Sequence, residues 1–226
     1  MKKANYFIML ALLGSTTVMS QPNTDSISLF GNKNLSPVNV KAAEDDYLGK
    51  KSLKVTDLGA DTKAKFVKID TYDFKNGIIE IELSGKPAES SSEQARGFVG
   101  IAFRIDKDNS KFECFYLRPT NGRADDQVRR NHSVQYISFP DFPWFKLRKE
   151  FPEKYESYVD LVSGEWTKVR IEVKDNHAKL FVHGNLQPTL LVNDLKLGAD
   201  HHGAVGLWIG PGTEAHFSNL RITKND

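Results

Sequence analysis

The sequence predicts an all-β fold in which two antiparallel sheets pack face to face as a β-sandwich. Ten short segments alternate in polarity or form brief apolar runs, turn-forming residues separate them, and no convincing amphipathic helix interrupts them. The segments are 52–56, 65–69, 77–83, 97–105, 111–118, 133–138, 167–173, 178–182, 204–209 and 215–222. The only competing helical pattern, 148–159, contains Pro152, which interrupts a helix. This spacing is typical of a β-sandwich.

The N-terminus predicts export. Lys2 and Lys3 precede a short apolar run over 6–13, and small residues near Ser20 are suited to cleavage before Gln21. The apolar run is too short for a membrane span, which needs roughly 20 residues. We therefore expect a signal peptide over 1–20 and a periplasmic or secreted protein, without a lipid anchor because no cysteine lies near the cleavage site.

Two further parts complete the expected organisation. Residues 21–50 are rich in Asn, Ser, Asp and Lys, and we expect them to lead into the domain and tie down one sheet edge. Residues 51–226 form the sandwich, enough for one well-cored domain. Cys114 is the only cysteine, so we expect neither an internal disulfide nor a cysteine zinc site.

The charge balance excludes some partners. The formal net charge is +2, and Lys2 and Lys3 account for all of it, so the remaining chain is neutral. A neutral chain has no overall field to attract nucleic acid or an anionic membrane. We expect neither nucleic-acid binding nor membrane insertion.

Side-chain alternation assigns faces to two of the strands. In 97–105 the odd-numbered apolar residues form the core face, which leaves Arg104 on the opposite face. In 111–118, Glu113 shares a face with Phe115, whereas Tyr116 and Arg118 lie on the other. If the two strands pair as a hairpin across 106–110, Arg104, Tyr116 and Arg118 line one groove, provided that the register permits it.

A long insertion over 118–145 is the strongest functional candidate, because long loops between strands often carry function. Its polar stretch, 120–132, contains almost nothing apolar, and the stretch 139–145 (FPDFPWF) adds a cluster of aromatic residues. Planar polar groups suit sugar hydroxyls or a carboxylated sugar; a solvated network of ion pairs is the alternative. Trp144 is the best candidate for stacking on a sugar, whereas Trp166 and Trp208 are expected in the core.

Glu80 and Glu82 form a second, weaker candidate. They alternate with apolar residues, so both carboxylates lie on one face, as in retaining glycosidases that hold two acids roughly 5 Å apart. A solvated strand face is the alternative, and it is the more common one. His201 and His202 are adjacent and expected in a loop, and no metal-binding motif is present.

Several segments resemble the concanavalin A-like lectin/glucanase superfamily, in the branch of laminin-G-like modules and bacterial 3-keto-disaccharide hydrolase-type domains. They are GIIEIELSG, GFVGIAFRID, FECFYLRP, GEWTKVRIEVKDNHAKLFVHG and GAVGLWIGPGTEAHFSNLRI. The resemblance covers residues 50–224 and implies a jelly roll that handles glycans on its concave face, here at Arg104, Tyr116 and Arg118. The chain lacks the paired-acid strand signature of the glucanases and the acidic calcium ligands of legume lectins.

We therefore expect an exported carbohydrate-binding or sugar-processing domain, with a non-enzymatic laminin-G-like module that binds a protein as the alternative. The expected ligand-binding residues are Arg104, Tyr116, Arg118, Asn121, Arg123, Gln127, Arg129 and Trp144. If the protein is an enzyme, acid–base work falls to Asp125, Asp126, Glu113 or His132. No cofactor is expected, and calcium is kept as an alternative. A sugar site needs a groove with converging polar groups, whereas a protein site presents Phe142, Trp144 and Phe145 as a flat patch.

Overall fold

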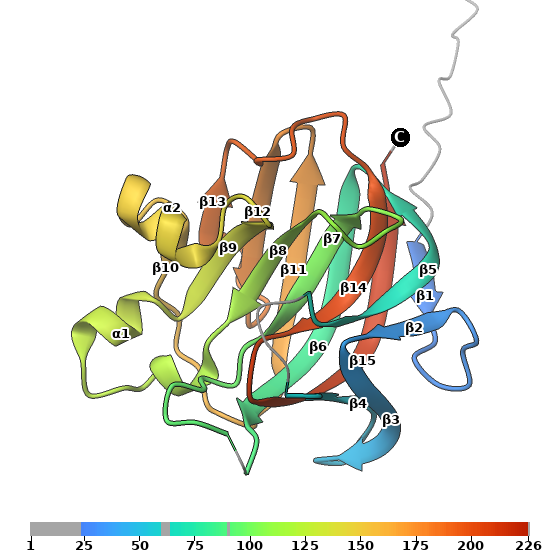
Figure 1. Ribbon diagram of the computed structural model, residues 1–226, viewed down its shortest axis with the longest axis horizontal. Helices are drawn as coiled ribbons and strands as arrows, with labels where there is room; N and C mark the ends of the chain where they lie inside the picture. Colours follow the sequence, from blue (N-terminus) through green and yellow to red (C-terminus); the bar gives the residue numbers. More distant parts are fainter. Residues whose placement is uncertain (1–23, 60–63, 90, 226) are drawn as a thin grey trace, which may run out of the picture.

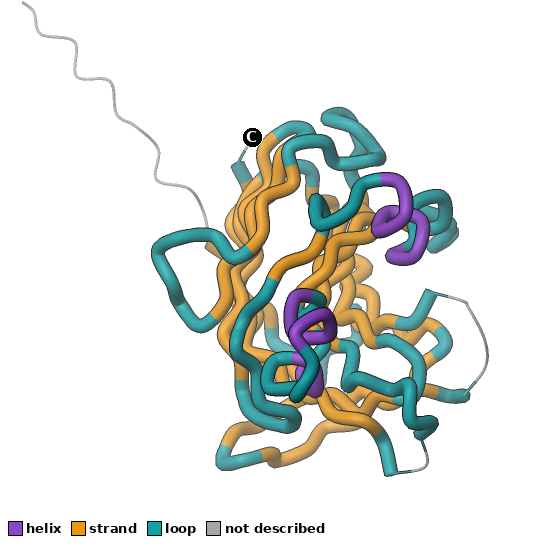
Figure 2. Tube along the Cα trace, turned by 90° about the vertical axis from the view of Figure 1, so that its left-hand side faces the viewer, coloured by secondary structure: helices purple, strands orange, loops and turns teal. Residues whose placement is uncertain are grey.

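The computed structural model describes residues 24–59, 64–89 and 91–225, so the expected signal peptide lies outside the described residues. Two antiparallel sheets stack as a sandwich (Figures 1 and 2). The order in the 8-stranded sheet is β13 (Leu190–Val192), β12 (His177–Val182), β11 (Thr167–Lys174), β6 (Gly77–Pro87), β15 (Thr213–Lys224), β4 (Lys50–Asp57) and β3 (Val40–Tyr47), with β1 (Thr24–Ile27) also paired to β15. The order in the 7-stranded sheet is β10 (Glu156–Ser157), β9 (Val134–Phe139), β8 (Phe112–Leu117), β7 (Val99–Ile105), β14 (Gly203–Ile209), β5 (Phe66–Phe74) and β2 (Leu35–Val38). The all-β sandwich is confirmed.

All ten predicted segments are strands, and the structure adds β1, β2, β3, β10 and β13. Three of the additions come from the segment 21–50, which supplies an edge strand to each sheet: β2 beside β5, and β3 beside β4. Only Val40 of β3 is buried. Edge strands exposed to solvent lack the apolar alternation by which a strand is recognised in sequence.

The insertion is more ordered than a loop. It contains a 3-10 helix, Pro119–Asn121, and two α-helices, α1 (Gln127–Asn131) and α2 (Trp144–Glu150), which lie beside β9 and β10 (Figure 1). The competing helical pattern at 148–159 does not form a helix over that range. Instead, α2 begins after Pro143 and ends before Pro152, because proline is tolerated at a helix start and not in its interior.

The hairpin of β7 and β8 forms as predicted, with Gly100 opposite Tyr116 and Ala102 opposite Cys114. Val99, Ile101 and their odd-numbered neighbours face the core between the sheets, so Tyr116 lies on the outer face. A Cβ at Gly100 would lie 2.1 Å from the Phe115 carbonyl oxygen, so only glycine permits this close pairing beneath Tyr116.

His216 lies 1% exposed under Tyr47, with ring centroids 3.8 Å apart and the Ser52 hydroxyl 3.2 Å from its Nδ1. Burial lowers the pKa of His216 below 6.5, although Glu214 and Asp45 raise it and Lys54 lowers it further. Between the two pKa values, His216 therefore binds a proton in the unfolded chain and not in the folded chain. The free energy of unfolding is expected to fall as the pH drops below 6.5, by up to about 1.4 kcal/mol per pH unit until the folded pKa is reached.

Urea unfolding between pH 7.5 and 5 measures this slope, and His216→Asn should flatten it. His177→Asn, at an exposed position at the start of β12, is the control and should leave the slope unchanged. An equal slope in the wild type and His216→Asn would contradict the assignment.

Candidate functional site

A groove of about 750 Å³ lies on the outer face of the 7-stranded sheet. Aromatic rings line it: Tyr116 on β8, Trp208 on β14, Phe98 before β7 and Trp144 at the start of α2. The Tyr116 ring centroid lies 4.8 Å from that of Trp208 and 6.1 Å from that of Phe98. These rings give the groove an apolar wall.

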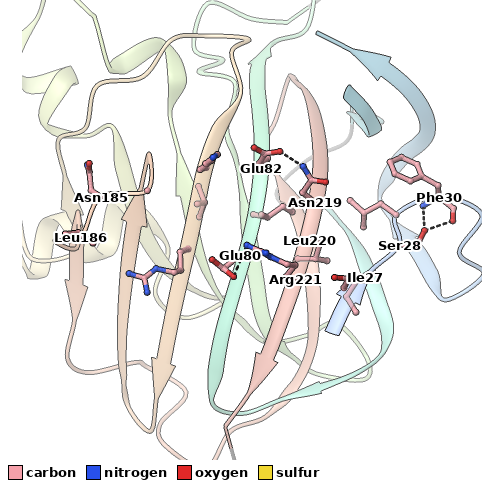
Figure 3. Close-up of a pocket in the computed structure, with 17 residues that line it drawn as sticks. Ile27, Ser28, Phe30, Glu80, Glu82, Asn185, Leu186, Asn219, Leu220 and Arg221 are labelled. Atoms are coloured by element: carbon pink, nitrogen blue, oxygen red, sulfur yellow. Dashed lines mark hydrogen bonds and ion pairs between the residues drawn. The ribbon is translucent and has the colours of Figure 1, made fainter. Parts of the chain in front are cut away.

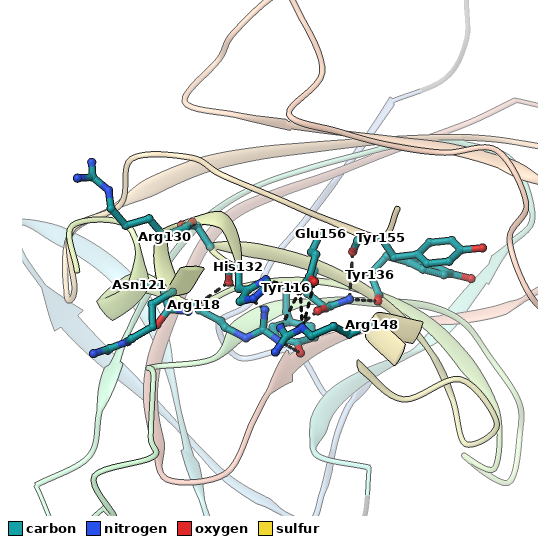
Figure 4. A network of polar contacts seen from close by, with 12 residues as sticks. Tyr116, Arg118, Asn121, Arg130, His132, Tyr136, Arg148, Tyr155 and Glu156 are labelled. Carbon is teal, nitrogen blue, oxygen red and sulfur yellow. Dashed lines mark hydrogen bonds and ion pairs between the residues drawn. The ribbon is translucent and has the colours of Figure 1, made fainter. Parts of the chain in front are cut away.

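Arg118 anchors the polar side of the groove (Figure 4). Its side chain donates to the Tyr116 hydroxyl at 2.8 Å, to Gln135 Oε1 at 3.2 Å and to the His132 carbonyl oxygen at 2.9 Å. The residue is only 5% exposed, and burial lowers its pKa. Burial also raises the pKa of Tyr116 to about 12, so the hydroxyl that accepts from Arg118 stays protonated.

A second network holds α2 against the sheet. Arg148 donates to both carboxylate oxygens of Glu156, with Nη2 2.7 Å from Oε2, and His132 Nδ1 lies 2.8 Å from the same oxygen. Burial lowers the pKa of His132, while Glu156 acts to raise it. The Arg148 guanidinium lies 4.8 Å from the Trp144 ring. The network therefore fixes Trp144 at the rim of the groove, 45% exposed.

Solved structures share this architecture, although comparisons of the sequence find no relative. No protein-family model matches the sequence, and no curated protein matches it. The carbohydrate-binding module CBM66 from Bacillus subtilis superposes with a TM-score of 0.52 at 15% identity, over 83% of this chain and 94% of that one. A candidate glycosyl hydrolase from Parabacteroides distasonis gives a TM-score of 0.51 at 12% identity, over 86% of this chain and 100% of that one. The fold is the concanavalin A-like jelly roll.

The jelly roll brings six of the predicted site residues to the groove: Tyr116, Arg118, Asn121, Arg129, His132 and Trp144.

The helices of the described residues are all too short or too polar to span a membrane.

Arg104 does not line the groove, and its predicted placement is corrected. Its backbone φ of 55° breaks the alternation of β7, and the fully buried side chain enters the interior. There it donates to the carbonyl oxygens of Lys75, Asp175 and Gly198, at 2.8, 2.7 and 2.8 Å. Arg104 therefore holds together three loops, which connect β5 to β6, β11 to β12 and β13 to β14.

Glu113 is likewise internal, 0% exposed on the core face of β8, where it accepts from the Tyr136 hydroxyl and from the Leu197 amide. Burial raises its pKa. This acid cannot meet a ligand in the groove on the opposite face of the sheet.

The other predicted residues lie on the exposed side of the insertion, outside the groove lining. Arg123 forms a bidentate ion pair with Asp160, Gln127 donates to Asn131 within α1, and Asp126 caps α1 by accepting from the Arg129 amide. Asp125 is exposed beside this cap. They form the network of surface ion pairs and hydrogen bonds that was the alternative interpretation.

Sequence reasoning missed Trp208, Phe98, Arg96 and Arg148. Alternation over 204–209 places Val205, Leu207 and Ile209 on the core face, so Trp208 belongs to the opposite face. That signal was available. Arg96 and Arg148 carried no such signal, since their positions depend on the loop before β7 and on α2.

Glu80 and Glu82 lie in a second groove, of about 860 Å³, on the outer face of the 8-stranded sheet (Figure 3). Glu82 is 2.8 Å from Lys50 Nζ and accepts from Asn219, and Glu80 Oε2 is 3.3 Å from Arg221 Nη2. Both acids are thus members of a ladder of charged pairs, as on an ordinary solvated strand face.

His201 and His202 each pair with a different carboxylate, Asp106 at 3.0 Å and Asp73 at 2.7 Å. Across the ranges 24–59, 64–89 and 91–225, no three His, Cys, Asp or Glu side chains are grouped so that they could hold a metal ion.

Proposed function

We propose that this protein binds a carbohydrate in the groove on the outer face of the 7-stranded sheet. The observation that carries the proposal is the convergence of Tyr116, Trp208 and Trp144 with Arg118 and Asn121 in one concave site. Sugar rings have apolar C–H faces that stack on aromatic rings, and their hydroxyls accept from guanidinium and amide groups. The description of CBM66 as a carbohydrate-binding module is in keeping with this function.

We propose binding without hydrolysis. Most glycosidases place two carboxyl groups on either side of the scissile bond. Among the groove-lining residues that the structure describes, Asp57 is the sole carboxylate, and it accepts from Lys65 at 2.5 Å and from the amides of Gly59 and Gly212. Glu156, behind the groove, is held by Arg148. Incubation of a bound glycan with the protein should leave the glycan intact, and release of a shorter sugar would contradict this.

The alternative, a protein-binding module, needs Phe142, Trp144 and Phe145 as a flat patch. Phe142 is instead half-buried, with Lys146 Nζ 4.5 Å and Lys196 Nζ 5.3 Å from its ring centroid. Trp144, 45% exposed, lines the groove, and the ring of Phe145, 60% exposed, lies at 88° to the Trp144 ring, so the two do not form a flat surface. This arrangement favours a sugar over a flat protein partner.

A glycan array carrying neutral, uronate-containing, sialylated and sulfated glycans tests the proposal, with each hit repeated by calorimetry. We expect binding of at least one class, with equal affinity in EDTA and in calcium chloride, because guanidinium groups in the groove repel a dication. Loss of binding in EDTA would revive the calcium alternative. Absence of binding to any glycan would overturn the proposed function, and capture of a protein partner would then be the next experiment.

Tryptophan fluorescence should report the bound sugar. Trp144 and Trp208 line the groove, whereas Trp166 packs against Tyr47 on the other sheet, with its Nε1 3.2 Å from the Tyr47 carbonyl oxygen. A sugar identified on the array is expected to change the emission of the wild type and of Trp166→Phe alike. Trp208→Phe and Trp144→Phe should each lose part of that change and bind several-fold more weakly, since stacking area is lost. A signal that survives in both groove variants and disappears in Trp166→Phe would place the ligand elsewhere.

We further propose that the protein is exported and acts in the periplasm or outside the cell, on the evidence of the N-terminal sequence. Expression of the full chain followed by N-terminal sequencing should yield Gln21 as the first residue. A protein retained in the cytoplasm with residues 1–20 intact would contradict export.

A further inference from the structure

The groove carries an excess of positive charge that a neutral sugar does not require. Four arginines from four segments line it: Arg96 before β7, Arg118 after β8, Arg129 on α1 and Arg148 on α2. The nearby carboxylates are already engaged: Glu156 by Arg148 and His132, and Asp57 by Lys65. Within the described residues, no carboxylate lies within ion-pair distance of Arg96, Arg118 or Arg129.

The hydrogen bonds of these arginines are directed to neutral acceptors. Arg118 donates to a hydroxyl, an amide and a carbonyl oxygen, and Arg96 donates to the carbonyl oxygens of Glu93 and Ala95. A buried cation usually has a carboxylate partner, because neutral acceptors repay only part of the lost hydration. Arg118, at 5% exposed, is therefore a buried charge without an ion-pair partner at the base of the groove, and Glu156 stabilises it only from a longer distance.

The arginines also act on one another. Burial lowers the pKa of Arg96, and the neighbouring charges of Arg129 and Arg118 lower it further. Like charges held together without a counter-ion raise the free energy of the empty groove. A bound anion relieves this repulsion, so the protein gains more from an acidic ligand than from a neutral one of the same shape.

A polar atom without a partner points to a ligand as well. Asn121 lines the groove and is 5% exposed, and its side-chain oxygen accepts no hydrogen bond from the described residues. Its amide nitrogen donates to the His132 carbonyl oxygen at 3.3 Å, which fixes the orientation. This buried oxygen is thus an acceptor that the described residues leave unsatisfied in a residue of the groove wall.

We infer that the ligand of this groove is an acidic saccharide, whose carboxylate or sulfate group binds between Arg96 and Arg129 above Arg118 while its ring stacks on the aromatic wall. The inference rests on the proposed function and narrows it to one chemical class. Guanidinium groups suit both anions because each offers oxygen pairs for bidentate hydrogen bonds.

The decisive experiment compares ligands whose main difference is the charge of one type of group. In the carboxylate arm, calorimetry compares an oligogalacturonide with its methyl ester. In the sulfate arm, it compares a sulfated oligosaccharide with its desulfated form. Where a charged glycan from the array binds more tightly than these probes, that glycan and its neutralised form are used in their place. We expect the charged member of at least one pair to bind at least tenfold more tightly, with affinity falling as salt rises. The arm that responds identifies the anion.

Two variants locate the anion. Arg96→Gln and Arg129→Gln are each expected to erase most of the preference for the charged form and to keep the weaker binding of the neutral form. Arg123→Gln, at an arginine on the same insertion but outside the groove, is the matched control and should keep the full preference. Thermal unfolding of each variant shows that the fold is retained.

The outcomes distinguish a failure of the acidic-ligand inference from a failure of the proposed carbohydrate binding. Equal binding of charged and neutral forms, or stronger binding of the neutral forms, would overturn the acidic ligand and leave the carbohydrate site in place. A charge preference that Arg123→Gln abolishes and the groove variants retain would also overturn it. No binding by any glycan would remove the proposed function and the inference together.

Discussion

Replacing Arg118 by alanine is expected to lower the affinity for the groove's ligand at least tenfold, because a charge-assisted hydrogen bond contributes about 1.5 kcal/mol or more. Arg118 acts in two ways: it supplies the buried charge, and its bonds to the Tyr116 hydroxyl and the His132 carbonyl oxygen hold one wall of the groove in place. Calorimetry with a sugar identified on the array measures the loss.

Two comparisons make the Arg118 result interpretable. Arg118→Lys keeps the charge and loses the fork of donors, so its affinity should lie between those of the wild type and Arg118→Ala. Arg123→Ala should bind as the wild type does, because the Arg123–Asp160 pair lies on the surface. Wild-type affinity in a folded Arg118→Ala protein would refute the groove as the binding site.

Arg104→Ala is expected to have the largest effect on stability, lowering the free energy of unfolding by about 3 kcal/mol or more. The substitution leaves the carbonyl oxygens of Lys75, Asp175 and Gly198 without their donor inside the protein. It also removes the positive charge that lowers the pKa of the buried Glu113. Urea unfolding at pH 7 measures the change.

Arg221→Ala is the control for Arg104, since its pair with Glu80 is on the surface and should be worth less than about 1 kcal/mol. Sugar affinity of Arg104→Ala, measured where the protein is fully folded, should match the wild type. A stability change below about 1 kcal/mol, or a selective loss of sugar binding, would show that Arg104 acts at the binding site, as alternation first suggested.

The sequence alone determined the sandwich, because a strand with one face in the core alternates apolar and polar side chains, and a strand covered on both faces, such as β7, forms an apolar run. The same rule placed Tyr116 away from the core, and applied to 204–209 it would also have found Trp208. The aromatic and arginine content of the insertion likewise indicated a ligand site, and five of its members, Arg118, Asn121, Arg129, His132 and Trp144, line the groove.

Tertiary structure decided which of these polar residues share a site. Arg104 left its predicted face because a single left-handed residue reverses the direction of a side chain, and its acceptors come from turns distant in sequence. Edge strands β2 and β3 bury too little to leave a pattern. Arg96 and Arg148 reach the groove only because a loop and a short helix close over one end of the sheet. Periodicity records which side of a strand is buried, whereas a site on a sheet is assembled by contacts between segments that no local pattern encodes.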